Sequence, residues 1–143
     1  MRHINTKSDS EILLNIFAHE LHLHSKESFT PDDVFYAVAG VHRRVKGAYA
    51  VVALISDRGI VAFRDPMGIR PLCFGTRKID GKTETMIASE SVALDSAGFK
   101  LERDIKPGEA IFVDIDGNIH SRLCSEETGY SPCIFEFVYF ARP

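Results

Sequence analysis

The chain has 143 residues, of which 45% are hydrophobic and 26% are charged. Its 17 Lys and Arg residues against 20 Asp and Glu residues give a net charge of −3. This length and apolar share suit a single folded domain and argue against intrinsic disorder. The slightly acidic balance, with basic residues scattered along the chain, argues against binding to nucleic acid or to an anionic membrane surface through charge.

Neither a membrane anchor nor a disulfide-bonded, exported protein is indicated. The longest apolar run, Ala48–Ile55, is far shorter than the roughly 20 residues of a membrane-spanning helix, and Met1–Asn5 contains no apolar signal core. No C-x-x-C pair occurs among the three cysteines, Cys73, Cys124 and Cys133. Neither a disulfide framework nor a zinc site is therefore predicted. We expect a cytosolic chain with reduced thiols. The alternative is a catalytic thiol, but the sequence places no base beside any of the three.

The first helix is expected close to the N-terminus. The pattern Ser8–Glu11 is typical of a capping box, and the apolar residues after it recur at helical spacing. These residues are Leu13, Ile16, Phe17 and Leu21. We therefore predict a helix from about Asp9 to His24.

A stronger helix-start signal follows at Thr30. Thr30 can cap a helix, Pro31 suits its first position, and Phe29 can pack onto Val34 as a hydrophobic staple. The acidic pair that follows favours the positive end of the helix dipole. One apolar stripe then runs toward Gly47, where the helix is expected to end. The stripe consists of Val34, Phe35, Val38, Val41 and Val45.

From Ala48 onward the chain changes to short β-rich runs separated by turn residues. The predicted strands are Ala48–Ser56, Ile60–Arg64, Leu72–Gly75, Thr85–Ala88 and an alternating run through Ile111, Val113 and Ile115 before the hairpin signal Asp116-Gly117. Because Ala48–Ile55 is almost wholly apolar, we expect it to be covered on both faces. Two amphipathic helices beside a largely antiparallel sheet predict an α+β sandwich. Cys133–Ala141 is a further apolar, strand-like run.

Three histidines lie near the end of the first predicted helix. His19 and His22 share one helix face, and with His24 they invite a metal interpretation, because imidazole is a good ligand for zinc and nickel. The pattern H-E-L-H differs, however, from the zinc motif H-E-x-x-H. We favour an exposed polar helix face over a metal site.

The densest local signal is Arg64–Leu72, with the sequence R-D-P-M-G-I-R-P-L. Its prolines fix φ and its glycine permits a positive φ. Such a turn can aim the guanidinium of Arg70 at an anion, or it can only join two strands while Asp65 pairs with an arginine or caps backbone donors. We favour the structural interpretation. Ala88–Ser91 is similarly ambiguous, since small hydroxyls and a carboxylate after a strand also start helices.

These segments and others resemble, in order along the chain, the amidophosphoribosyltransferase family, whose members use glutamine and phosphoribosyl pyrophosphate to make phosphoribosylamine in the first step of purine synthesis. The resembling segments are His3–Glu11, Gly47–Ala50, Asp65–Leu72, Ala88–Ser91, Pro107–Glu109 and Phe135–Pro143. The loop D-P-x-G-x-R-P-L and the strand ending in S-E are shared with other N-terminal-nucleophile amidotransferases, including asparagine synthetase. The ending F-E-x-V-Y-F-A-R-P is more specific to this family.

The resemblance implies that residues 1–143 are the later part of a type 2 glutamine amidotransferase domain, ending where a phosphoribosyltransferase domain would join. The implied fold is part of a four-layer αββα sandwich of the N-terminal-nucleophile class. In the family, an N-terminal cysteine thiolate attacks the glutamine amide, backbone and asparagine donors stabilise the oxyanion, and ammonia moves to the second domain. No cysteine lies near Met1, and the family's arginine loop and asparagine–glycine segment have no counterpart. We therefore expect the chain alone to lack glutaminase activity.

One substrate-binding residue carries over from the resemblance. The aspartate of the family's S-D-S-E segment, which matches Asp9, contacts the α-amino group of glutamine. A carboxylate can hold an ammonium group by a charge-assisted hydrogen bond, although Asp9 could instead serve only the positive end of the first helix. Some members also bind an iron–sulfur cluster with a ligand near Cys133, but a lone cysteine cannot hold a cluster. We expect no cofactor in this chain and magnesium only in the adjoining domain.

The resemblance thus implies an inactive piece of an enzyme that uses glutamine and phosphoribosyl pyrophosphate and forms a homo-oligomer. Two alternatives remain open: a non-catalytic binding or scaffold module with the same fold, and a piece of another class II amidotransferase such as asparagine synthetase. If the chain is a piece of the amidophosphoribosyltransferase, its sheet edges have lost their partners, which predicts aggregation or self-association through strand surfaces.

Overall fold

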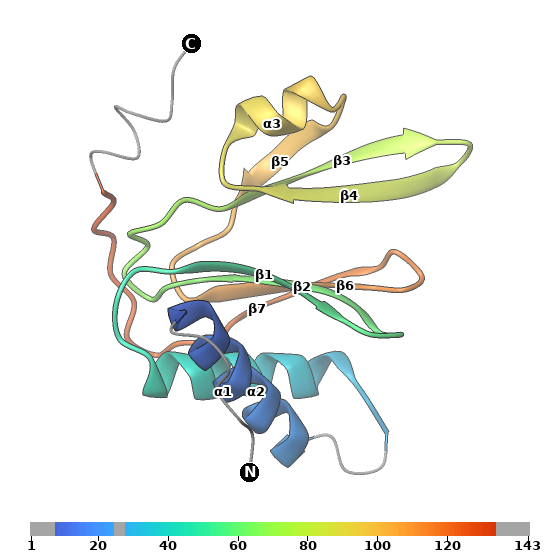
Figure 1. Ribbon diagram of the computed structural model, residues 1–143. Coiled ribbons are helices and arrows are strands. Elements are labelled where there is room, and N and C mark those ends of the chain that lie inside the picture. Colours follow the sequence, from blue (N-terminus) through green and yellow to red (C-terminus); the bar gives the residue numbers. More distant parts are fainter. Residues whose placement is uncertain (1–7, 25–27, 134–143) are drawn as a thin grey trace.

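Three helices and seven strands make up the chain in the computed structural model, which describes residues 8–24 and 28–133 (Figure 1). The helices are α1 (Asp9–His24), α2 (Pro31–Arg44) and α3 (Ser91–Ser96). The strands are β1 (Ala50–Ile55), β2 (Gly59–Arg64), β3 (Cys73–Ile79), β4 (Lys82–Ala88), β5 (Lys100–Asp104), β6 (Glu109–Asp114) and β7 (Ile119–Leu123).

The strands form two antiparallel sheets that stack between helices. One sheet has the order β1-β2-β6-β7 and the other the order β4-β3-β5. Helices α1 and α2 cover the outer face of the first sheet, and α3 covers the outer face of the second (Figure 1). The predicted α+β sandwich with largely antiparallel sheets is therefore confirmed, and its layers follow the order α, β, β, α.

The alternation of side chains along each strand creates these layers. On β2, Val61 and Phe63 face the helical layer, where they join a core with Phe17 of α1. Ala62, between them, faces the second sheet and packs in a separate core with Ile111 of β6. A third core under α3 is formed by Cys73, Leu94 and Phe99. Because both faces of β2 and β6 are buried, these two strands form the centre of the molecule.

The helix starts agree with their sequence signals. Helix α1 has the predicted bounds, and its Ser8–Glu11 capping box stays a prediction. At the start of α2, the Asp33 carboxylate accepts hydrogen bonds from the Thr30 backbone N–H at 2.7 Å and from the Thr30 hydroxyl at 3.0 Å. This contact closes the predicted cap. Helix α2 ends at Arg44, three residues before the expected Gly47.

The interpretation of β1 as a strand covered on both faces is wrong. Its alternate residues Val51, Ala53 and Ile55 pack against the helical core, whereas Val52 and Leu54 are 54% and 77% exposed. The reason lies in the sheet order, since β1 is the edge strand of the first sheet and the core between the two sheets contains no residue of β1. An apolar run therefore indicated a strand here without indicating how deeply it is buried.

Several strand bounds differ from those predicted. Strands β3 and β4 extend into a longer hairpin through polar residues, and β5 was not predicted at all because its sequence K-L-E-R-D is mostly charged. The predicted turn at Asp116-Gly117 joins β6 to β7, but β6 ends at Asp114, which leaves Ile115 exposed. Of the expected strand Cys133–Ala141, all but Cys133 lies outside the described residues.

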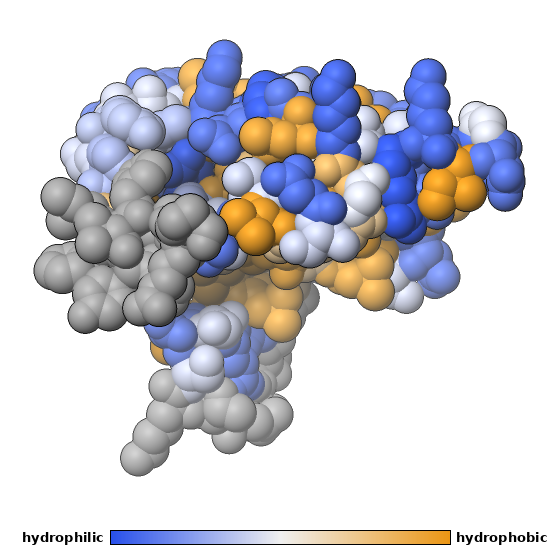
Figure 2. Space-filling model, turned by 90° about the horizontal axis from the view of Figure 1, so that it is seen from above, coloured by the Kyte–Doolittle hydropathy of each residue, from blue (hydrophilic) through white to orange (hydrophobic). Residues whose placement is uncertain are grey.

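The outer surface above α3 is mixed in character. Figure 2, which views the molecule from above, shows hydrophilic side chains interspersed with hydrophobic ones. Much of the hydrophilic character comes from the β3–β4 hairpin, which carries Arg77, Lys78, Lys82 and Glu84. In the described part of the chain, no helix is both long enough and apolar enough to cross a membrane.

Candidate functional site

A groove of about 990 Å³ runs beside the outer edge of β1. Four segments that are far apart in the sequence contribute to its walls: the first residues of α1, the link from α2 into β1, the end of the Arg64–Leu72 loop, and the link from β4 to α3. Each of these segments carries one of the motifs singled out in the sequence. Their convergence makes the groove the candidate functional site.

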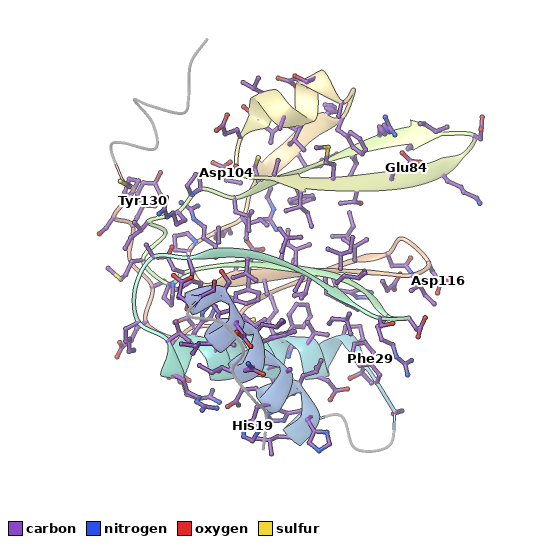
Figure 3. All side chains as sticks on the ribbon, in the orientation of Figure 1. His19, Phe29, Glu84, Asp104, Asp116 and Tyr130 are labelled. Atoms are coloured by element: carbon purple, nitrogen blue, oxygen red, sulfur yellow. The ribbon has the colours of Figure 1, made fainter. Side chains whose placement is uncertain are left out.

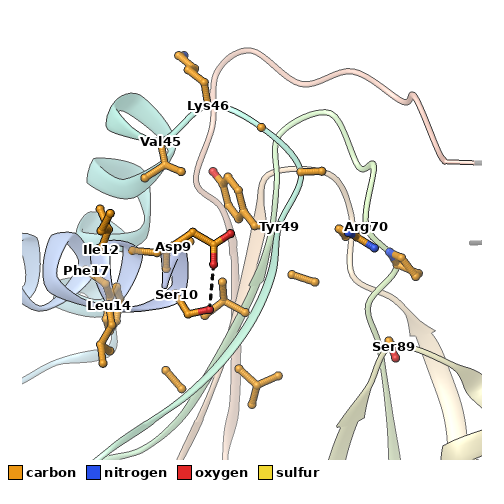
Figure 4. A pocket seen from close by; sticks show the side chains of 18 of the residues that line it. Asp9, Ser10, Ile12, Leu14, Phe17, Val45, Lys46, Tyr49, Arg70 and Ser89 are labelled. Atoms are coloured by element: carbon orange, nitrogen blue, oxygen red, sulfur yellow. Dashed lines mark hydrogen bonds between the residues drawn. The ribbon is translucent and has the colours of Figure 1, made fainter. Parts of the chain in front are cut away.

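Asp9 lies at the mouth of this groove as the first residue of α1 (Figure 4). Its carboxylate is exposed, and Oδ1 accepts a hydrogen bond of 3.4 Å from the Ser10 hydroxyl. The groove position suits contact with a ligand, and the helix-end position suits interaction with the helix dipole. Both hypotheses for Asp9 are therefore compatible with the geometry, and its substrate contact stays a prediction.

Asp65 organises the loop that leads into the groove. Its carboxylate is fully buried and accepts hydrogen bonds of 3.1 Å from the backbone N–H groups of Met67, Ile69 and Arg70. Its own backbone N–H donates to the Tyr49 carbonyl at 2.9 Å. A buried carboxylate needs such donors to offset its desolvation. The favoured structural interpretation, in which Asp65 caps backbone donors, is confirmed.

The two arginines of this loop have different surroundings. The Arg64 guanidinium is buried and donates to the carbonyls of Ile105 at 3.0 Å and Gly68 at 2.7 Å, so it braces the loop from inside. The side chain of Arg70 is exposed and lines the groove (Figure 4). The loop therefore joins two strands and also presents one guanidinium at the candidate site.

Ser89 and Glu90 lie where β4 passes into α3, and both line the groove. Helix α3 begins at Ser91 with Glu90 in the N-cap position, which confirms that this run starts a helix. The segment therefore has a structural role and a groove position together.

Tyr49 is a buried wall residue of the groove with a partner on α2. Its hydroxyl lies 2.7 Å from Nδ1 of His42, and both rings pack against Phe63. Burial lowers the pKa of His42 to about 4 and raises the pKa of the Tyr49 phenol, so both groups are neutral near pH 7. His42 was not among the site residues predicted from the sequence. It follows Val38 by four residues and Phe35 by seven, so it falls on the buried stripe of α2. This helical spacing is the sequence feature that could have predicted the burial of His42.

Two of the three cysteines do not resemble activated nucleophiles. Cys73 and Cys124 are buried, and burial raises the pKa of the first thiol to about 11 and of the second to about 12. A thiol with a raised pKa carries little of the reactive thiolate near pH 7. Cys133 is half-buried beside the Asp65 loop, and its N–H donates to the Ile69 carbonyl at 3.4 Å.

The metal hypotheses find no support in the geometry. His19, His22 and His24 are exposed on α1 and none of them lines the groove. Figure 3 shows His19 in the helical layer. His24 stacks on Tyr36 with ring centroids 5.2 Å apart. Within residues 8–24 and 28–133, no group of three or more His, Cys, Asp or Glu side chains is placed to hold a metal ion, so the surroundings of Cys133 there do not fit an iron–sulfur cluster.

Comparison with known proteins identifies the class that this fold and groove define. Residues 1–96 match the family model described as a glutamine amidotransferase domain. The chain therefore belongs to the glutamine amidotransferase domain family. Its stacked sheets between helices have the N-terminal-nucleophile fold expected from the resemblance.

Individual relatives are more specific. The chain is 55% identical to the amidophosphoribosyltransferase of Pseudomonas aeruginosa over 143 residues, which are 100% of this chain and 28% of that protein. It is 54% identical to the amidophosphoribosyltransferase of Pasteurella multocida over 142 residues, 99% of this chain and 28% of that protein. The glutamine phosphoribosylpyrophosphate amidotransferase from B. subtilis, solved with ADP and GMP, matches with a TM-score of 0.75 and 29% identity over 99% of this chain and 28% of that chain. The predicted resemblance is confirmed, and the chain spans about 28% of the length of these relatives.

Proposed function

We propose that this chain forms part of the glutamine-hydrolysing half of an amidophosphoribosyltransferase, an enzyme that makes 5-phosphoribosylamine from glutamine and phosphoribosyl pyrophosphate in the first step of purine synthesis. The observation that carries the proposal is the convergence of four separate motif segments on one groove. The names of relatives up to 55% identical support it. The chain contributes walls and core to the glutamine site, while the nucleophile and oxyanion donors come from outside it.

Within this proposal, Asp9 binds the α-amino group of glutamine. The exposed carboxylate at the mouth of the groove can accept hydrogen bonds from an ammonium group and compensate its charge. Binding at this end would orient the side-chain amide along the groove, toward the nucleophile. Asp9 is then a substrate-positioning residue, and the hydrolytic chemistry takes place elsewhere in the site.

The proposal also covers partners and cofactors. Phosphoribosyl pyrophosphate and magnesium would bind in an adjoining domain, this chain would hold no cofactor, and the whole enzyme would be a cytoplasmic homo-oligomer. The unpaired thiols of Cys73, Cys124 and Cys133 suit a reducing compartment.

The test is ammonia release from L-glutamine by two proteins. One is this chain, and the other is this chain extended upstream with the preceding segment of the Pseudomonas aeruginosa relative. We expect ammonia only from the extended protein, because only that protein carries an N-terminal cysteine. Activity of the short chain would contradict the proposal and indicate a nucleophile among its own cysteines.

A matched pair of substitutions in the extended protein separates the two hypotheses for Asp9. Asp9→Asn removes a charge at the first turn of α1 inside the groove, and Asp32→Asn does the same at the first turn of α2, where the carboxylate forms an exposed ion pair with Arg122. Substrate contact predicts a rise of roughly tenfold or more in the KM for glutamine for Asp9→Asn alone. Similar small stability losses in both variants, without a change in KM, would show that Asp9 serves only the helix dipole.

The same extended protein distinguishes the two alternatives. A scaffold module would release no ammonia even with the upstream cysteine in place. A piece of asparagine synthetase would release ammonia, but its parent would pass it to an aspartate-derived acceptor instead of phosphoribosyl pyrophosphate. Measuring phosphoribosylamine formation by the full-length parent protein therefore decides between the two enzymes.

A further inference from the structure

The buried pair of His42 and Tyr49 connects helix α2 to two walls of the groove. The Tyr49 hydroxyl lies 2.7 Å from His42 Nδ1, and the Tyr49 carbonyl accepts a 2.9 Å hydrogen bond from the Asp65 N–H. The Asp65 carboxylate in turn accepts the backbone N–H of Arg70 at 3.1 Å. Hydrogen bonds thus run from α2 through one groove residue, Tyr49, to another, Arg70.

This connection is well placed to fix the shape of the groove. His42 is 4% exposed and does not line the groove, so it can act there only through a neighbour. Tyr49 follows the link Lys46–Ala48, whose residues are exposed and also line the groove. With its hydroxyl held by α2, the Tyr49 ring has a defined position on this wall (Figure 4). A polar group buried among aromatic rings is costly unless it is hydrogen-bonded, so the bond restricts both side chains to one arrangement.

We propose that His42 is a positioning residue of the glutamine site, which sets the affinity for glutamine by holding the Tyr49 hydroxyl and thereby the groove wall that faces the ligand. The inference rests on the proposed function for the identity of the ligand. The placement of the wall itself does not depend on that function. His42 has no part in proton transfer in this proposal.

The test uses the full chain, labelled with ¹⁵N, and three substitutions. Tyr49→Phe removes only the hydroxyl, His42→Leu removes the ring nitrogens, and His42→Asn keeps a polar group near the position of Nδ1. The exposed stacked pair of His24 and Tyr36 offers matched controls, His24→Leu and Tyr36→Phe. Glutamine affinity is measured by titration of amide chemical shifts, and stability is measured by thermal unfolding.

We expect Tyr49→Phe and His42→Leu to weaken glutamine binding roughly fivefold, because glutamine must then order a groove wall that one neutral hydrogen bond no longer holds. His42→Asn and both control variants should bind within about twofold of the unsubstituted chain. If Tyr49→Phe and His42→Leu lose thermal stability but bind glutamine normally, the pair is only structural and the inference is wrong. If His42→Asn binds as weakly as His42→Leu, the hydrogen bond is not the cause and the inference is also wrong.

A measurement without ligand separates this inference from the proposed function. If the unsubstituted chain does not bind glutamine, the segments that complete the site from outside this chain are required for glutamine recognition by the groove. The positioning role would then be judged from the amide resonances of Gly47, Tyr49 and Arg70 in the free protein. They should shift in both Tyr49→Phe and His42→Leu and stay unchanged in the His24 and Tyr36 controls. Unchanged resonances in the first two variants would overturn the inference.

Discussion

At the scale of single residues, buried charge is placed where backbone donors are concentrated. The Asp65 carboxylate is completely buried, and both of its oxygens accept N–H groups from the loop that follows it. Gly68 makes the loop possible by adopting a φ of +63°, and a Cβ at this position would lie 2.7 Å from Cγ of Pro107. The carboxylate therefore selects one loop conformation, and that conformation sets where Arg70 enters the groove.

Asp65→Asn should destabilise the chain by about 2 kcal/mol, because one acceptor oxygen becomes an NH₂ group that faces backbone donors. Urea unfolding followed by circular dichroism measures the change. Asp80→Asn makes the same chemical change in an exposed turn with a φ of +50°, which asparagine tolerates, and should alter stability by less than about 0.5 kcal/mol. Equal effects of the two substitutions would contradict the role given to Asp65.

Asp114 gives the chain a pH-dependent contribution to stability. The hydrogen bond from His120 at 3.0 Å, supported by Asn118 and the Asp116 N–H, lowers the pKa of this carboxyl to about 2. A carboxyl whose pKa is lower in the folded state stabilises that state above its unfolded pKa of about 3.9. The contribution is lost as pH falls toward 2.

At pH 5, Asp114→Asn should therefore unfold at a lower urea concentration than the unsubstituted chain. The difference between their midpoint urea concentrations should become smaller from pH 4 to pH 2. Asp116→Asn is the control, since Asp116 lies at the tip of the same hairpin (Figure 3). The control should show no such narrowing. If the difference in midpoint between Asp114→Asn and the unsubstituted chain stays constant from pH 5 to pH 2, the ionisation of Asp114 does not contribute to stability.

At the scale of secondary-structure elements, the two outer strands of the first sheet differ in how they meet solvent. Strand β1 has the sequence A-V-V-A-L-I, without a charged residue, and within the described residues its outer edge pairs with no other strand. Strand β7 at the opposite edge carries His120 and Arg122. Charged side chains protect an edge strand from pairing with another chain, so β1 is more prone than β7 to such pairing.

We expect the chain to self-associate through β1, and Leu54→Lys should reduce this association. Leu54 is 77% exposed, so the substitution should change the free energy of unfolding by less than about 0.5 kcal/mol. Leu123→Lys is the matched control on β7, where the leucine is 57% exposed. Sedimentation velocity over a range of concentrations compares the three proteins. Equal behaviour of the two lysine variants would show that β1 is not the associating edge.

At the scale of the whole molecule, one ion pair joins the two sheets near the crossing from β5 to β6. The buried carboxylate of Glu109 on β6 accepts hydrogen bonds from both terminal nitrogens of Arg103 on β5, at 2.7 and 2.8 Å, and from the Lys106 N–H at 2.7 Å. The Arg103 guanidinium also lies 5.3 Å from the ring centroid of Phe74, in the core between the sheets. The pair therefore fixes the relative position of the two sheets on which the groove depends.

Glu109→Gln should destabilise the chain by about 2 kcal/mol, because it breaks a bidentate pair and leaves a buried group poorly satisfied. Glu84→Gln is the control, since its carboxylate pairs with Arg77 on the exposed β3–β4 hairpin, and it should cost less than about 1 kcal/mol. Chemical unfolding at pH 7 measures both variants. A Glu109→Gln variant as stable as the Glu84→Gln variant would show that the pair between the sheets contributes little.

The local signals in the sequence were sufficient for the elements that they control. The cap at Thr30, the periodicity of α1 and α2, and the turn at Asp116-Gly117 each depend on residues a few positions apart, and the structure has all three. The order of motifs along the chain also indicated the family, which the comparisons confirm. Polar strands such as β5 were missed because pairing with β3, and not local composition, makes them strands.

The tertiary structure alone decided which residues meet and which are covered. Asp9, Tyr49, Arg70 and Ser89 are brought together in one groove by sheet order and helix packing, which act over long sequence separations. His42 became a candidate only when its buried contact with Tyr49 was seen, and β1 proved half-exposed because its place at the sheet edge is set by strands far along the chain. Local interactions determine the type of an element, whereas burial and proximity depend on every element that packs around it.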